Sequence, residues 1–304
     1  MTRSSIKLGI ACVYFYGADG RWLLDLQLNY IASTLAGYDY TVYAGANRLQ
    51  PELRALLQNT PRVKIIDLPT FSGEGGREHA FYLDKLLSRA VSDGCTYVTT
   101  LDSDSFPILP DWPQYLLQQM GSTIRLAAVL RTENLDTFLP HPCGYFMHRS
   151  FLLDRQPMLM PAENELKSER FKEFLDATHQ RVDNGIGYAY SLWCHAEKWL
   201  PLHRSNFYNP HFLMAGIYGG IFFHLGAGSR QPSFHVDYAT RPSLRLAINL
   251  RRLPFIWRAG THLENRYLEY NGKIYKQITN ALKSDAPKFF AQLTLGLAPK
   301  IDTA

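Results

Sequence analysis

The sequence has little of what marks several common classes of protein. Its four cysteines are scattered and lack zinc-finger spacing, a usage that fits a reducing compartment. The pairs His141–Cys143 and Cys194–His195 offer a zinc site, but such short pairs also arise by chance. There is no nucleic-acid-binding motif, internal repeat or low-complexity run, and the polar N-terminus leads straight into a strand, so we expect no signal peptide. We therefore predict a cytoplasmic protein that does not bind nucleic acid.

A long apolar run is also missing. The most apolar window, residues 212–228, is short, rich in glycine and interrupted by His224, so we interpret it as buried strands and not as a membrane span. The 304 residues are 46% hydrophobic and 13% aromatic, enough core for one large domain or two modest ones. The formal net charge of +5 suits an anionic ligand or an anionic membrane surface.

Apolar stretches with strand-like and helix-like spacing alternate along the first two thirds of the chain. The predicted strands cover residues 7–16, 40–44, 63–68, 97–101, 126–130 and 144–147. The predicted helices cover residues 23–35, 51–58, 78–91, 112–120, 169–179 and 188–195. This alternation favours βαβ units, and so predicts an α/β fold around a mostly parallel central sheet flanked by helices.

Two carboxylates follow the predicted strand at 97–101. Asp102 and Asp104 are separated by one serine at the point where the chain leaves the sheet, the usual place for ligands in open α/β sheets. Carboxylates this close repel each other unless a cation lies between them, and oxygen ligands suit Mg²⁺ or Mn²⁺. The alternative interpretation is that both residues only cap the turn before Pro107 and Pro110.

A glycine-rich loop opens the predicted helix at 78–91. Backbone N–H groups exposed at a helix start attract anions, and Arg77 adds a guanidinium suited to phosphate. A plain surface loop with a solvated arginine has the same sequence pattern. The loop is not of the Walker type, because no Gly-Lys-Ser/Thr sequence closes it.

Two later residues are candidates for chemistry. Asp183 precedes the predicted helix at 188–195, where it is either a helix cap or, if partly buried, a general base. His224 ends an apolar stretch and is followed by small residues and then by Arg230, so its neutral imidazole is a candidate third metal ligand.

The last segment changes character. Residues 243–252 place apolar side chains on one helical face and arginines on another, and aromatic residues such as Trp257 follow. A basic amphipathic helix with aromatics fits a peripheral contact with the inner face of an anionic membrane. Helices packed against the core of the protein are the commoner explanation.

The order of these features resembles that of the metal-dependent nucleotide-sugar glycosyltransferases of the GT-A fold, with a DxD motif and related to family two. The resemblance covers residues 6–235 and rests on an ordered set of short pieces. They are an N-terminal βαβ half, the Gly76-Arg77 loop with His79, the Asp102-x-Asp104 triplet, a strand at 144–148, Asp183 before a helix, and His224-x-Gly226. It implies a catalytic domain over residues 1–235, with a nucleotide half (1–105) and an acceptor half (106–235), and a helical C-terminal extension over 236–304.

The resemblance also implies roles for individual residues. Asp104 and His224 would hold Mn²⁺ or Mg²⁺, and Asp102 would bind the metal or the ribose. A UDP- or GDP-sugar donor would transfer its sugar to a glycan, lipid-linked or small-molecule acceptor, with Asp183 as the base of an inverting reaction. The donor would be bound by Tyr14, Phe15, Asn47, Asp67, Arg77, His79, Asp102, Ser103 and Arg230.

Two departures leave alternatives open. The acid pair usual before the late helix is here Val182-Asp183, so one carboxylate is missing. The ending His224-x-Gly226 followed by Arg230 also resembles the His-x-Gly-x-x-Lys ending of retaining members, which leaves the stereochemistry open. The alternatives of other classes are a nucleotidyltransferase that consumes a nucleoside triphosphate and a non-catalytic binding module.

Overall fold

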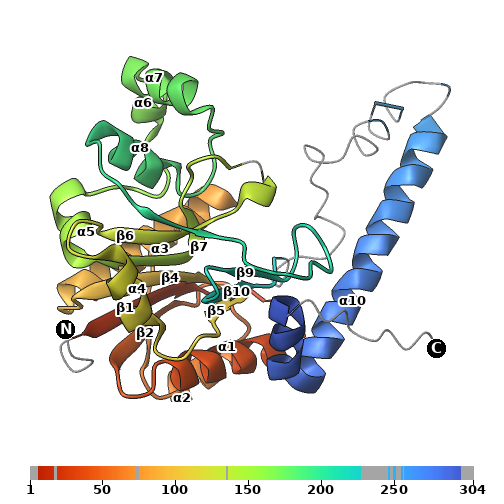
Figure 1. Ribbon diagram of the computed structural model, residues 1–304, viewed down its shortest axis with the longest axis horizontal. Coiled ribbons are helices and arrows are strands. Elements are labelled where there is room, and N and C mark those ends of the chain that lie inside the picture. The colour runs from red at the N-terminus through yellow and green to blue at the C-terminus, as the bar shows by residue number, and fades with distance from the viewer. Residues whose placement is uncertain are drawn as a thin grey trace.

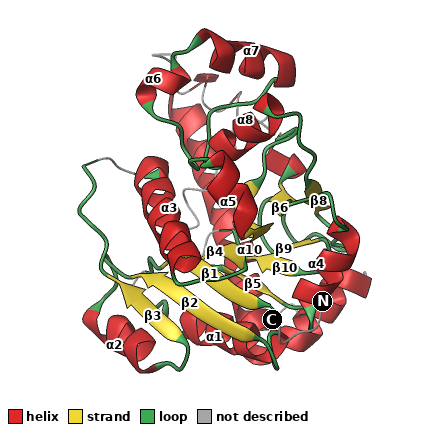
Figure 2. Ribbon diagram, turned by 90° about the vertical axis from the view of Figure 1, so that its left-hand side faces the viewer, coloured by secondary structure: helices red, strands yellow, loops and turns green. Residues whose placement is uncertain are grey.

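A computed structural model of the chain describes residues 6–16, 19–72, 75–134, 136–226, 246, 249–250, 255 and 257–295. A central sheet lies between two layers of helices, and a long C-terminal helix stands beside it (Figures 1 and 2). The predicted α/β class, with a mostly parallel sheet flanked by helices and a helical C-terminal segment, is confirmed by this arrangement. The domain boundary that we predict at residue 235 lies outside the described residues.

The central sheet has seven strands in the order β3-β2-β1-β4-β7-β6-β8. Six of them run parallel, and β7 runs opposite to its neighbours β4 and β6. Because β1 and β4 lie side by side in parallel, their carboxyl ends meet at one edge, where β7 begins. The strands are β1 (Lys7–Val13), β2 (Asp39–Gly45), β3 (Val63–Ile66), β4 (Tyr97–Asp102), β6 (Leu126–Leu130), β7 (His141–His148) and β8 (Leu200–His203).

A second sheet of three short strands, in the order β5-β10-β9, packs beyond the end of β4. The strands are β5 (Ser105–Pro107), β9 (Gly216–Tyr218) and β10 (Phe222–His224), and β10 is antiparallel to both others. Residues 216–218 and 222–224 of the apolar window at 212–228 therefore form buried strands, as the sequence predicts. The pairing of β10 with β5 brings the late segment of the chain against the residues that follow β4.

Helices cover both faces of the central sheet (Figure 2). Apolar side chains of α1, α2, α4 and α10 form one core, and those of α3, α5 and α8 form the core on the opposite face. A third cluster joins α7 to α8. The helices are α1 (Arg21–Thr34), α2 (Pro51–Asn59), α3 (Gly76–Ser92), α4 (Trp112–Met120), α5 (Arg149–Arg155), α6 (Glu163–Leu166), α7 (Glu169–Thr178), α8 (Ile186–Cys194) and α10 (Trp257–Leu295), with a 3-10 turn at Thr132–Asn134.

The long helix α10 is anchored by its C-terminal half. It bends at Asp285, just before Pro287, and beyond the bend the ring of Phe290 lies 4.9 Å from that of Phe223. The carbonyl of Leu293 also accepts a backbone N–H from Phe207, at 2.8 Å. This half of α10 is a packing element. Most of the amphipathic segment at 243–252 lies outside the described residues.

No helix in the described ranges combines the length and the apolarity needed to cross a bilayer.

Three details of the fold differ from expectation. β5 and β8 do not appear among the predicted strands, because runs of three and four residues are too short for an alternating pattern to emerge. β7 starts three residues earlier than predicted, which places His141 and Cys143 inside the strand. The chain that leaves β6 turns back into β7 at the same edge of the sheet, so β7 runs antiparallel to β6 and β4. No local sequence pattern predicts this direction.

Candidate active site

The two carboxylates lie at the carboxyl end of β4, in the turn that leads to β5. Asp102 is the last residue of β4, and its side chain is one-fifth exposed. Asp104 is buried, and its carbonyl accepts the N–H of Leu225 at 3.0 Å. Because Leu225 directly follows β10, this bond fixes the end of β10 against the acidic turn.

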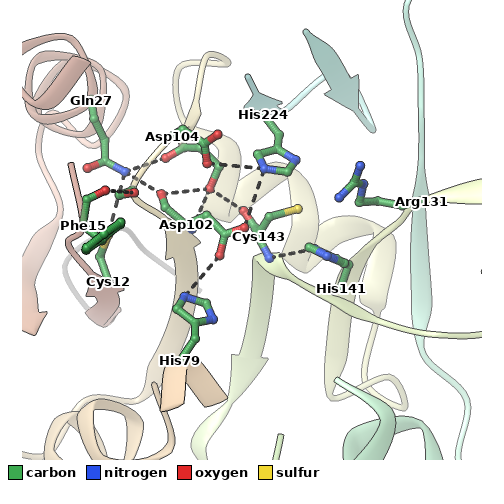
Figure 3. A network of polar contacts seen from close by, with 12 residues as sticks. Cys12, Phe15, Gln27, His79, Asp102, Asp104, Arg131, His141, Cys143 and His224 are labelled. Carbon is green, nitrogen blue, oxygen red and sulfur yellow. Dashed lines mark hydrogen bonds and ion pairs between the residues drawn. The ribbon is translucent and has the colours of Figure 1, made fainter. Parts of the chain in front are cut away.

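His224 and His79 approach the carboxylates from two sides (Figure 3). The Nε2 atom of His224 lies 3.4 Å from Oδ1 of Asp104 and 3.6 Å from Oδ2 of Asp102. The Nε2 atom of His79, from the first turn of α3, lies 3.5 Å from Oδ1 of Asp102. Four residues named from the sequence thus converge on one point from α3, β4, the turn after it, and β10.

Buried hydrogen bonds fix the backbone of this turn. The side-chain amide of Gln27, fully buried on α1, donates to the carbonyl of Asp102 at 2.8 Å and to that of Ser105 at 2.7 Å. The Ser105 hydroxyl accepts the N–H of Asp102 at 2.8 Å and donates to the carbonyl of Cys143 on β7 at 2.6 Å. Sequence analysis missed Gln27, because one polar residue on an apolar helix face forms no motif.

These residues fit a divalent cation. One ligand atom from each of Asp102, Asp104 and His224 lies within 4.8 Å of the other two, a separation that an ion bound at about 2.1–2.3 Å from each can bridge. The Oδ1 atom of Asp102 is buried and accepts no hydrogen bond from the described residues. Two carboxylates and one imidazole suit Mn²⁺, and Mg²⁺ accepts the same carboxylates with more bound water.

A second group of side chains lines the site from β7. A ring nitrogen of His141, the Sγ atom of Cys143 and a carboxylate oxygen of Asp102 lie within 4.8 Å of one another. Burial, aided by the nearby charge of Arg131, lowers the pKa of His141 well below its usual value. Burial also raises the pKa of the Cys143 thiol well above its usual value, so both groups are neutral. The other pair considered for zinc, Cys194–His195, joins no such cluster within the described part of the chain.

The residues after β1 lie beside the acidic turn. The Tyr16 hydroxyl donates to the carbonyl of Ser103 at 2.5 Å, and the Ser103 hydroxyl donates to the carbonyl of Phe15 at 3.4 Å. The Phe15 side chain is 46% exposed, so its ring is free to contact a ligand. The ring of Tyr14 lies in the core instead, at 1% exposure.

The other residues assigned to the nucleotide side are engaged elsewhere. Asn47 donates to the carbonyl of Leu68 at 3.0 Å. Exposed Asp67 pairs with Arg54 at 3.1 Å. Arg77 pairs with a glutamate of α6 at 3.1 Å, and its side chain is half exposed. Arg230 lies outside the described residues.

Asp183 occupies an exposed turn before α8. Its carboxylate accepts the N–H of Asn184 at 2.7 Å, while the residue at the cap position of α8 is Gly185, which has a positive φ of 96°. A Cβ atom on Gly185 would lie 2.2 Å from the carbonyl oxygen of Pro140, directly before β7. The side chain of Asn184 lies against Gly76, where α3 begins. The turn therefore lies at the edge of the sheet that holds the acidic turn, without the side-chain cap considered from the sequence.

Asp136, which sequence analysis missed, lies in the loop before β7. Burial raises its pKa to about 7, the charge of Arg131 opposes that shift, and Asp183 and Glu133 add to it. Its Oδ2 atom is buried without a hydrogen-bond partner among the described residues. A single aspartate in a polar loop carries no sequence signal, so only the fold reveals this acid next to Asp183.

No protein-family model and no curated protein matches the chain. Among solved structures, TarS of S. aureus in complex with UDP-GlcNAc aligns with 96% of this chain and 79% of its own, at 11% identity and a TM-score of 0.43. A glycosyltransferase involved in glycosylation of the major capsid of PBCV-1 aligns with 65% of this chain and 80% of its own, at 10% identity and a TM-score of 0.35. The glycosyltransferase GlyE of Streptococcus pneumoniae aligns with 65% and 45%, at 12% identity and a TM-score of 0.36. At such identities and TM-scores, function has to be argued from the site itself.

Proposed function

We propose that this chain is a metal-dependent glycosyltransferase that moves a sugar from a nucleoside-diphosphate sugar to an acceptor hydroxyl. The observation that carries the proposal is the convergence of Asp102, Asp104 and His224 at the carboxyl end of the parallel strands. Ligands bind at this edge in open α/β sheets. The S. aureus protein TarS, similar in structure, has been solved with UDP and with UDP-GlcNAc, and we infer a UDP- or GDP-linked donor here.

Asp104, Asp102 and His224 would hold the metal, Mn²⁺ or Mg²⁺. When bound, such an ion stabilises negative charge on a leaving diphosphate. Beside it, Phe15 and Ser103 would contact the nucleoside, and His79 would orient Asp102. Three other residues could contact the nucleotide-sugar donor only after breaking their present interactions, namely Arg77, Asn47 and Asp67.

Asp183 is the proposed general base. In the reaction the acceptor hydroxyl gives its proton to the carboxylate while its oxygen bonds to the anomeric carbon. The bond from that carbon to the diphosphate breaks, and the electron pair leaves with the phosphate oxygen. Attack from the opposite face inverts the configuration, and because Asp183 is exposed, an acceptor from solvent can reach it.

Retention remains the alternative outcome within the same class. A retaining reaction would need a different role for Asp183. Asp136, a carboxyl near Asp183 with a pKa of about 7, would give the site a second acid or base. A nucleotidyltransferase would use the same metal carboxylates on a nucleoside triphosphate and release pyrophosphate. Product analysis separates these reactions, since a glycosyltransferase releases UDP or GDP.

The proposal is tested by calorimetry with UDP, GDP and Mn²⁺. The wild-type protein is expected to bind one of the nucleotides more tightly in the presence of Mn²⁺, and Asp104→Ala is expected to lose that dependence on the metal. Exchange of another acid, Asp176→Ala, which is exposed on α7, is the matched control. If no nucleotide binds with or without metal and Asp104→Ala changes nothing, the proposal is wrong.

We also propose a peripheral membrane contact at the first half of α10, as suits a lipid-linked acceptor. Trp257 and Leu263 are 46% and 43% exposed there, and Arg258 stacks 5.5 Å from the Trp257 ring. Exposed aromatics next to arginines favour an anionic bilayer surface at the inner face of a membrane. Sedimentation with anionic and with neutral vesicles tests this, because Trp257→Ala combined with Arg258→Ala should release the protein from the anionic vesicles only.

A further inference from the structure

The ring of His141 is held as one tautomer. The backbone N–H of Cys143 donates to its Nδ1 atom at 3.2 Å. A ring nitrogen that accepts a hydrogen bond carries no proton, so the proton of this ring is on Nε2. His141 therefore presents an N–H donor at Nε2 and not a lone pair.

This donor has no hydrogen-bond partner in the described part of the chain. The ring centre of His141 lies 6.1 Å from that of His224, and one of its nitrogens lies within 4.8 Å of an Asp102 oxygen. Figure 3 shows Arg131 next to both rings. The guanidinium of Arg131 is nearly buried, with a side chain that is 12% exposed, and its Nε atom lies 3.5 Å from a carboxylate oxygen of Glu133. This wall of the site therefore offers an N–H donor beside an ion pair.

The same hydrogen bond argues against His141 as a metal ligand. Coordination through Nε2 would move the ring proton to Nδ1, where it would point at the N–H of Cys143. The sulfur of Cys143 is fully buried and makes a weak ligand as a neutral thiol. The cation would therefore be bound by Asp102, Asp104 and His224, and His141 would lie beside it as a hydrogen-bond donor.

We propose that the Nε2–H of His141 donates a hydrogen bond to a non-bridging oxygen of the diphosphate of the nucleotide donor. The inference rests on the proposed function and adds a binding residue to it. An anionic oxygen is the favoured acceptor because a hydrogen bond to a charged group is stronger than one to a neutral group, and because a neutral donor does not repel the neighbouring ion. The bond is made to the intact donor and strengthens as charge develops on the leaving phosphate.

Three substitutions at His141 separate this role from others. Glutamine places its amide nitrogen where Nε2 lies, asparagine places its amide where Nδ1 lies, and leucine keeps the bulk without a donor. In calorimetry with Mn²⁺ and UDP or GDP, His141→Leu and His141→Asn are expected to weaken nucleotide binding about tenfold, and His141→Gln to stay within about threefold of the wild type.

His148 is the matched control, because the same type of bond holds it at the opposite end of β7. Its Nδ1 atom accepts the N–H of Ser150 at 3.2 Å, and its neighbour across the sheet is Tyr97, where β4 begins. His148→Leu should change the free energy of unfolding as His141→Leu does, without changing nucleotide affinity. Urea unfolding of each variant shows whether it is folded.

Three outcomes overturn the inference, and they differ from failure of the proposed function. If the wild type binds nucleotide with Mn²⁺ and His141→Leu binds it equally well, the hydrogen bond to the diphosphate is wrong. If His141→Leu loses Mn²⁺ binding in the absence of nucleotide, His141 is a metal ligand. If ¹⁵N spectra of the histidine rings place the proton of His141 on Nδ1, the donor has the wrong tautomer. If the wild type binds no nucleotide at all, the proposed function itself is wrong.

Discussion

The turn with Asp102 and the turn with Asp183 lie at the same edge of the sheet but are anchored in different ways. The first is held by the side-chain amide of Gln27, which has no titratable proton at any ordinary pH. The second is held through Leu159, whose carbonyl accepts the N–H groups of Gly185 at 3.1 Å and of Gly187 at 3.3 Å. The N–H of Leu159 in turn donates to the carboxylate of Asp84 on α3 at 3.1 and 3.2 Å.

The difference matches the roles that we propose for the two turns. Metal ligands have to stay in place, and a buried neutral amide holds the backbone of Asp102 whatever the pH. A general base has to meet an acceptor that enters from solvent, and the turn with Asp183, our proposed base, is exposed. The consequence is that the second turn depends on a partly buried carboxyl group, Asp84, whose pKa burial raises to about 8.

The functions of the two turns are distinguished most clearly by removing their carboxylates one at a time. Asp183→Asn is expected to lower kcat by about 10²- to 10⁴-fold, because the acceptor hydroxyl loses its base, while nucleotide affinity stays unchanged. Steady-state kinetics together with calorimetry measures both. Asp176→Asn, an exposed change on α7, is the control. A loss of folding or of nucleotide binding in Asp183→Asn would show that this residue is structural.

A methyl group at Gly185 should displace the second turn and leave the first intact. Its φ of +96° disfavours other residues, and a Cβ atom would meet the Pro140 carbonyl oxygen at 2.2 Å. We expect Gly185→Ala to lower the free energy of unfolding by about 3 kcal/mol and turnover by more than tenfold, with Mn²⁺ binding preserved. Gly37, where a Cβ atom meets nothing within 4 Å at a φ of +85°, is the matched control. Equal effects of the two substitutions would exclude the clash as the cause.

The sequence predicted the first turn far better than the second, for a physical reason. The burial pattern of the strand before Asp102 and Asp104 is visible in a few consecutive residues. His224 likewise ends a buried apolar stretch, so both signals can be recognised in the sequence. The anchors Gln27 and Asp84 carry no local signal, since each acts on backbone groups 75 or more residues away. The neutral state of His141 likewise depends on burial by segments that assemble only in the fold.

Loss of the first anchor should weaken the metal site without abolishing it. Gln27→Leu removes the amide that donates to the carbonyls of Asp102 and Ser105, leaves the Asp102 carbonyl only the Ser105 hydroxyl at 3.3 Å, and so allows the turn to shift. Mn²⁺ affinity is expected to fall about tenfold, the usual size of an effect exerted through residues behind the ligands. Titration with Mn²⁺ detected by electron spin resonance measures it, with exposed Gln58→Leu as the control. Unchanged affinity would mean that Ser105 alone fixes the turn.

The second anchor should respond to pH where the first does not. The pKa of Asp84 is about 8 in the folded protein against an ordinary value of 3.8, so the folded state holds this proton more tightly than the unfolded chain does. The stabilising contribution is therefore complete below about pH 4 and is lost as the pH rises towards 8. Asp84→Asn should remove that part of the slope in urea unfolding between pH 5 and 9. Asp93 is the opposite case, since its hydrogen bond from Lys64 lowers its pKa to about 2, and its contribution is lost only towards acid.

The same titration should appear at the backbone that Asp84 holds. Above pH 8 the ionised carboxylate lies partly buried near Tyr145 and Tyr188, with the positive charge of Lys85 close enough to lower its pKa, and the Leu159 segment should open more often to solvate it. Hydrogen-exchange protection factors of Gly185 and Gly187 are then expected to fall severalfold from pH 6 to pH 9 in the wild type and to stay level in Asp84→Asn. Protection at Asp102, which donates to Ser105 in the turn held by Gln27, should be constant in both proteins. Parallel changes at the two turns would mean that the whole domain loosens with pH, and the contrast between a titratable and a neutral anchor would be wrong.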